Sequence, residues 1–183
     1  QAIKGIIFNE GDYNLLLNYL DRYHGIAFHY ISQPIQFLIH GMVEKLGETS
    51  SEGSIYLSRH AVIFFVFSIS GYFFYLLCLK ISKDRNFSLV GVTLFLLYPY
   101  FFGHSQINGK DIPFLSVWII STYFLFVLIE NFYNEQKIDI KTVFLISFST
   151  AFLISIRITG ILILLEYLIA LIILLNTKNK NSL

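Results

Sequence analysis

Long runs of uncharged, mostly apolar residues alternate with short polar segments over the last two thirds of this 183-residue chain. Five runs stand out, and only the fifth contains a charged residue, Glu166; they cover residues 61–79, 87–102, 112–129, 142–156 and 158–175. About 20 residues of α-helix cross the ~30 Å hydrocarbon core of a bilayer, and polar or tyrosine-bearing flanks complete the shorter runs. The pattern therefore predicts an all-α integral membrane protein with about five transmembrane helices.

Composition supports this fold class. The chain is 55% hydrophobic and 17% aromatic, values that soluble domains rarely reach. We expect a membrane bundle over residues 60–177, followed by a basic tail at residues 178–183. Its helices are predicted at about residues 60–81, 87–103, 112–131, 142–157 and 158–176.

Residues 1–59 have a different pattern, in which one stretch is amphipathic. Ser32 is a candidate N-cap, Pro34 falls in the first turn, and Gly47 ends the pattern. Apolar residues recur at helical spacing between them, at Ile35, Leu38, Ile39, Met42 and Leu46. This helix is too short to span a bilayer. We predict that it lies flat at the interface, within an external juxtamembrane segment.

The distribution of Lys and Arg predicts the orientation. If the segments 80–85 and 131–141 and the tail after Asn176 are cytoplasmic, that side holds Lys80, Lys83, Arg85, Lys137, Lys141, Lys178 and Lys180. The opposite short loops hold only Lys110 and Arg157. Because cytoplasmic loops carry an excess of basic residues, residues 1–59 and the loop around His104 are expected together on the outer or lumenal side.

The loop at residues 104–113 concentrates ionisable and amide side chains between two apolar runs. Lys110 and Asp111 sit where the backbone leaves the hydrocarbon, so they are candidates for binding a ligand at the membrane surface. Alternatively, Asp111 caps the next helix, with Pro113 in its first turn, while Lys110 snorkels. His104 and Asn108 are candidates for hydrogen bonds to sugar or phosphate, or for satisfying the loop backbone.

Two motifs resemble a known group of enzymes. The pattern FFGHSxxNxKDxPF at residues 101–114 resembles an external loop of the lipid-phosphate-sugar-dependent glycosyltransferases, namely the dolichyl-phosphate-mannose protein mannosyltransferase and aminoarabinose transferase-like families. Residues 155–160, Ser-Ile-Arg-Ile-Thr-Gly, resemble the SIRxxG segment at an external helix junction of the same families. The resemblance implies the multi-pass GT-C superfold and covers the chain from about Tyr23 to Asn176.

The resemblance also implies a chemistry. Transfer of a sugar from a polyprenyl phosphate needs a carboxylate to take the acceptor's proton and cations to stabilise the departing phosphate. Lys110 and Arg157 are the candidate cations. These families carry the base in an acidic pair after their first membrane helix, which is not evident here. The base is therefore expected upstream of Gln1, in a chain that looks like a fragment, with Asp12 and Asp111 as weak candidates.

Arg157 and a pair at the start of the first membrane run have simpler explanations too. Snorkelling alone accounts for Arg157 about as well as a bound phosphate does. Arg59 and His60 form either an anion site or an interfacial anchor. Glu166 lies nine residues beyond Arg157, on the opposite helix face, so the two cannot pair within one helix and the partner of Glu166 must come from elsewhere. Cys78 is interpreted as packing, and no metal, cofactor or nucleic-acid site is predicted.

Two functions follow as hypotheses. The first is a membrane glycosyltransferase whose partners are a polyprenyl-phosphate-linked sugar, the lipid bilayer and a protein, lipid or glycan acceptor. The implied location is the bacterial inner membrane, or the endoplasmic reticulum membrane in a eukaryote. The alternative is a multi-pass transporter or lipid flippase in which Arg157 and Glu166 line a path. Transporters often have paired halves or broken helices, and the sequence indicates neither.

Overall fold

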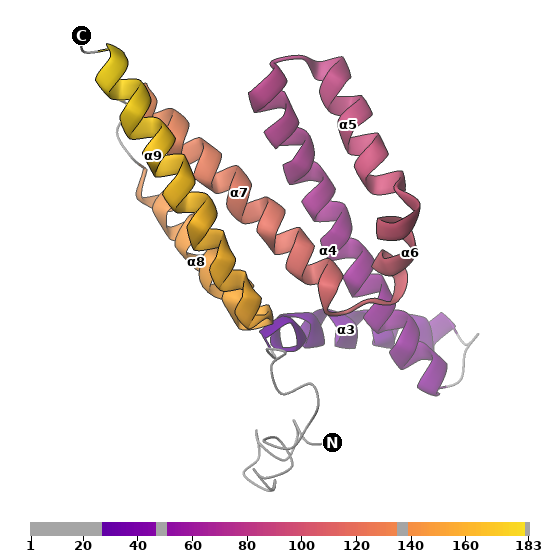
Figure 1. The fold of residues 1–183 in the computed structure, drawn as a ribbon. Coiled ribbons are helices and arrows are strands. Elements are labelled where there is room, and N and C mark those ends of the chain that lie inside the picture. The colour runs from indigo at the N-terminus through magenta and orange to yellow at the C-terminus, as the bar shows by residue number, and fades with distance from the viewer. Residues whose placement is uncertain (1–26, 47–50, 135–138, 182–183) are drawn as a thin grey trace, which may run out of the picture.

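The computed structural model describes residues 27–46, 51–134 and 139–181, and this part of the chain consists of helices joined by short turns (Figure 1). No strand occurs among these residues, which agrees with the predicted all-α class. The elements are α3 (Ala27–Leu46), α4 (Ser51–Ser82), α5 (Arg85–Leu97), α6 (Pro99–Ile107), α7 (Asp111–Tyr133), α8 (Ile140–Ile156), the 3-10 helix η1 (Ile158–Leu162) and α9 (Ile163–Asn181).

Three stretches are long and apolar enough to cross a membrane: Ile55–Ser82, Asp111–Tyr133 and Ile158–Asn176. A fourth span results if the bent pair α5 and α6 counts as one. The predicted count of about five is not confirmed, because α8 has only 17 residues, a length of about 25 Å at the rise of an α-helix. Three to four such helices are consistent with a membrane protein.

The predicted helix over residues 87–103 is two helices, because the chain bends by 55° between α5 and α6. Pro99 is the first residue of α6 and lacks a backbone N–H. The ring of a proline also disfavours helical geometry in the residue before it, and Tyr98 is accordingly extended, with φ −57° and ψ 119°. The apolar run continues through the bend, so hydropathy alone does not reveal it.

Helix α3 lies across one end of the bundle, whereas α4, α7, α8 and α9 run lengthwise (Figure 1). The same end contains the turn between α6 and α7 and the junction of α8 with η1; we call it the α3 end. At the opposite end lie the α4–α5 turn and the last residues of α9, and an ion pair joins Lys80 to Glu130. Two of the three segments whose basic residues predict one side, the α4–α5 turn and the end of α9, thus lie at one end of the bundle.

The start of α3 differs from the prediction. The helix begins at Ala27, so Ser32 is an interior residue and its role as an N-cap is wrong. Its buried hydroxyl donates to the His29 carbonyl at 3.2 Å and accepts a hydrogen bond from the side chain of Gln36 at 3.0 Å. The extra turn is held by Phe28, whose side chain is buried in the core. The first described turn of α3 is therefore packed into the core.

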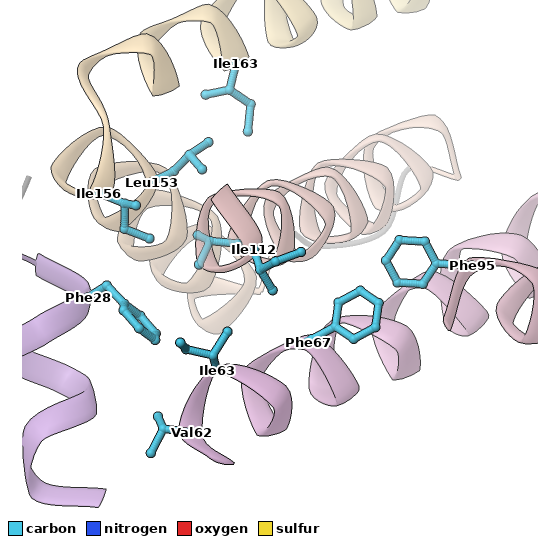
Figure 2. Close-up of a cluster of buried hydrophobic side chains, with 10 residues drawn as sticks. Phe28, Val62, Ile63, Phe67, Phe95, Ile112, Leu153, Ile156 and Ile163 are labelled. Atoms are coloured by element: carbon cyan, nitrogen blue, oxygen red, sulfur yellow. The ribbon is translucent and has the colours of Figure 1, made fainter. Parts of the chain in front are cut away.

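The buried core extends under the α3 end and joins most of the elements (Figure 2). Phe28 of α3 packs with Ile63 of α4 and Ile112 at the start of α7, and Ile156 and Ile163 bring in α8 and α9. Many of the remaining apolar side chains are exposed on the outer faces of the bundle, as expected for helices that face lipid. The polar groups of the α3 end thus lie next to a well-packed hydrophobic core.

Candidate functional site

Asn108 organises the turn between α6 and α7. Its Oδ1 accepts hydrogen bonds from the backbone N–H groups of Lys110, at 3.0 Å, and Asp111, at 2.9 Å. Its Nδ2 lies 3.0 Å from Asp111 Oδ2 and 3.2 Å from His104 Nδ1. One amide therefore fixes the backbone and two neighbouring side chains. Helix α7 begins at Asp111 itself and Lys110 is at the N-cap position, so the alternative that Asp111 is the cap is wrong; the N–H groups of Lys110 and Asp111 donate instead to Asn108.

Arg157, which lies between α8 and η1, reaches the α6–α7 turn. Its guanidinium forms an ion pair with the Asp111 carboxylate and lies over the Phe114 ring, 5.7 Å from the centroid. The side chains of Arg157 and Asp111 are 33% and 55% exposed, so water still reaches the pair. Arg157 thus has a carboxylate and an aromatic partner, in addition to any snorkelling towards the interface.

Gly160 explains how Arg157 is placed. Arg157 is extended, with φ −147° and ψ 136°, between the end of α8 and η1. The Gly160 N–H donates to the Arg157 carbonyl at 2.8 Å, which forms the first turn of η1. A Cβ at residue 160 would lie 2.8 Å from the Leu153 carbonyl oxygen and 2.9 Å from the Ile154 nitrogen. Only glycine fits this approach of two backbones, which accounts for the glycine in the SIRxxG segment.

Arg59 adds a further cation from α4. A Cβ at Gly109 would lie 3.6 Å from an Arg59 guanidinium nitrogen, so the guanidinium lies against the α6–α7 turn beside Lys110. The pKa of the His29 imidazole in α3 is lowered, mainly by burial and further by the positive charges of Arg59 and Lys110. The α3 end thus brings together the cationic side chains Arg59, Lys110 and Arg157 from three segments of the described chain, and Asp111 pairs with Arg157.

Other predicted residues lie elsewhere. His60 contacts Tyr56 one turn earlier in α4, with ring centroids 6.5 Å apart, rather than joining the hydrogen bonds of the turn. Glu166 accepts a hydrogen bond from Trp118 Nε1 at 2.8 Å, which supplies its partner from another helix as predicted. Asp12 lies outside the described residues. Within the described part of the chain, no three His, Cys, Asp or Glu side chains are grouped to hold a metal ion.

Two residues of this region were missed by sequence reasoning. His29 gave no signal, because its position depends on how α3 packs across the bundle. Tyr100 carried one: it lies four residues before His104, the spacing that stacks side chains on one helix face. In the structure the Tyr100 and His104 rings are 4.3 Å apart between centroids.

The chain matches no protein-family model, no curated protein and no solved structure. Its resemblance to lipid-phosphate-sugar-dependent glycosyltransferases therefore stays a prediction from the motifs at residues 101–114 and 155–160.

Proposed function

We propose that this protein is a membrane glycosyltransferase that binds a polyprenyl-phosphate-linked sugar at the α3 end. The observation that carries the proposal is the gathering of Arg59, Lys110 and Arg157 around one hydrogen-bonded turn at the end of an apolar bundle. A polyprenyl phosphate combines a long apolar tail with an anionic head. Its tail fits the lipid-facing helices, and its phosphate fits cations held at their ends.

The cations have a chemical role in this proposal. As the sugar leaves, negative charge builds up on the departing phosphate, and cations already in place stabilise it without reorganisation. In this proposal the positive charges of Lys110 and Arg59 add to the attraction for the phosphate. Because Asp111 partly neutralises Arg157, Arg157 helps to position the ligand more than it adds net positive charge. Asp111 is engaged with Arg157 and Asn108, which favours an orienting role over that of a general base.

The contacts of Arg157 and Glu166 weaken the case for a transporter or flippase. That hypothesis needs both side chains to line one path across the bilayer. Arg157 instead pairs with Asp111 at the α3 end, and Glu166 accepts from Trp118 between α7 and α9. Each therefore has a fixed partner, and the two partners lie at different positions along α7.

Lipid binding tests the proposal directly. The full-length protein is placed in nanodiscs, and binding of a polyprenyl phosphate is measured by native mass spectrometry. Lys110→Gln and Arg59→Gln should each weaken binding about 10-fold, the scale of one lost charge-assisted hydrogen bond. Lys80→Gln is the matched control, because that lysine lies at the opposite end, paired with Glu130. Wild-type affinity in both α3-end variants would overturn the proposal.

Transfer is the second readout. With a polyprenyl-phosphate sugar as donor, Lys110→Ala and Arg157→Ala should reduce the rate ~10²-fold or more, as when one donor to a transition state is removed. Lys83→Ala, in the α4–α5 turn at the opposite end, should leave the rate unchanged. Near-normal rates in both α3-end variants would contradict a phosphate site here.

A further inference from the structure

Helix α6 presents an aromatic and polar face beside the cations. Tyr100 and His104 are four residues apart in α6, so they stack along one side of the helix, and Asn108 follows directly after its end. The Tyr100 and His104 rings are 4.3 Å apart between centroids, with their planes 41° apart. Tyr100 is 59% exposed, and His104 is half-buried beneath it. The ring of Tyr100, near the start of α6, is therefore open to a ligand, and His104 and Asn108 connect it to the α6–α7 turn.

The hydrogen bonds of Asn108 determine where the proton of His104 lies. Its Oδ1 is fixed as an acceptor, because two backbone N–H groups donate to it. The Nδ2 group must then point at Asp111 Oδ2 and at His104 Nδ1, and it carries only hydrogens to donate. His104 Nδ1 is consequently an acceptor. In the neutral imidazole the proton lies on Nε2, which makes that nitrogen a hydrogen-bond donor.

We propose that Tyr100 and His104 form a subsite for the sugar ring of the lipid-linked donor. This inference rests on the proposed function and deepens it. The C–H groups on one face of a pyranose carry partial positive charge and stack on the negative face of an aromatic ring such as Tyr100. A hydroxyl oxygen of the same sugar accepts the Nε2–H of His104. Asn108 links this pair to the Lys110 backbone, so the subsite adjoins the predicted phosphate position.

Two probes separate the contribution of the sugar to binding from that of the lipid phosphate. Wild-type protein in nanodiscs is given a bare polyprenyl phosphate or the same lipid carrying a hexose, and both affinities are measured. Wild type should prefer the hexose-bearing lipid. Tyr100→Ala and His104→Ala should each lose this preference by ~10-fold while still binding the bare lipid. Tyr100→Phe keeps the ring and should keep most of the preference.

Tyr98→Ala is the matched control for a simple interfacial anchor. Tyr98 is 54% exposed, lies two residues away, and packs on Phe101 instead of His104. It should retain the wild-type preference. The subsite is overturned if Tyr100→Ala discriminates between the two lipids like wild type, or if Tyr98→Ala loses as much preference. If wild type binds neither lipid, the proposed function itself fails, so the two failures are distinguishable.

Discussion

Replacing Gly160 by alanine should destabilise the protein through one steric contact. The added Cβ meets backbone atoms, namely the Leu153 carbonyl oxygen at 2.8 Å and the Ile154 nitrogen at 2.9 Å. Real Cβ atoms almost never come this close, and a backbone cannot rotate away as a side chain can. Gly160 is outside the left-handed region, so alanine can adopt its backbone angles. The whole cost therefore comes from pushing η1 away from α8.

Overpacking of this kind costs about 1–3 kcal/mol. For a chain of this size each kcal/mol shifts Tm by roughly 2–4 °C, so we expect a Tm lower by about 2–12 °C. The chain has a single cysteine, Cys78, which is half-buried in α4 and faces Gly91 of α5. Heating the detergent-solubilised protein with a fluorogenic maleimide therefore reports unfolding at a site outside α8 and η1.

Two other glycines provide matched controls. A Cβ at Gly41 of α3 or Gly103 of α6 would have no neighbour within 4 Å. Alanine at either position should leave Tm unchanged or raise it, because alanine is favoured over glycine inside a helix by up to about 1 kcal/mol. If Gly160→Ala melted at the same temperature as Gly103→Ala, the close contact between η1 and α8 would be refuted.

Three further predictions concern α3, the α4–α5 turn and orientation. Because the folded state lowers the pKa of His29 below its ordinary value of about 6.5, its contribution to stability should be complete above that pH and should fall as the pH drops below it. In thermal melts between about pH 7.5 and 5, His29→Gln should reduce the dependence of Tm on pH. The same dependence in wild type and variant would contradict the burial of His29. Asp84 caps α5 by accepting from two backbone N–H groups, so Asp84→Ala should cost about 1 kcal/mol, and an unchanged Tm would argue against the cap. In a variant lacking Cys78, cysteine at exposed Gln106 should react with an impermeant maleimide applied to whole cells, and cysteine at exposed Asn134 should not; the reverse would invert the orientation.

The prediction of helices succeeded where the signal is local, and it failed at particular residues. Helix α7 runs over Asp111–Tyr133, close to the predicted 112–131, because an unbroken apolar run and a polar turn define it. The bend at Tyr98 was available in the sequence through Pro99, yet the apolar run concealed it. The helical turn before Ser32 was not available from residue spacing, and in the structure Phe28 of this turn is buried in the core.

For the candidate site, too, the sequence located residues by local signals, whereas the structure decided the contacts that they make. The sequence singled out Asn108, Lys110, Asp111 and Arg157, because polar groups between apolar runs are conspicuous. It offered Asp111 as a helix cap only as an alternative, whereas in the structure Asn108 accepts the hydrogen bonds from the N–H groups of Lys110 and Asp111. Which of several nearby polar side chains takes that role depends on the loop's backbone angles, and residue spacing does not fix those angles.

By itself the sequence determined the all-α class, the apolar helices and the grouping of basic loops, because hydropathy and charge act on each segment separately. Tertiary structure alone decided the pairings: Arg157 with Asp111, 46 residues apart, and Trp118 with Glu166, 48 apart. It also decided that Arg59 lies against Gly109. Such contacts depend on the relative rotation and depth of helices, which the packing of Phe28, Ile63 and the rest of the core fixes jointly, and no single segment encodes them.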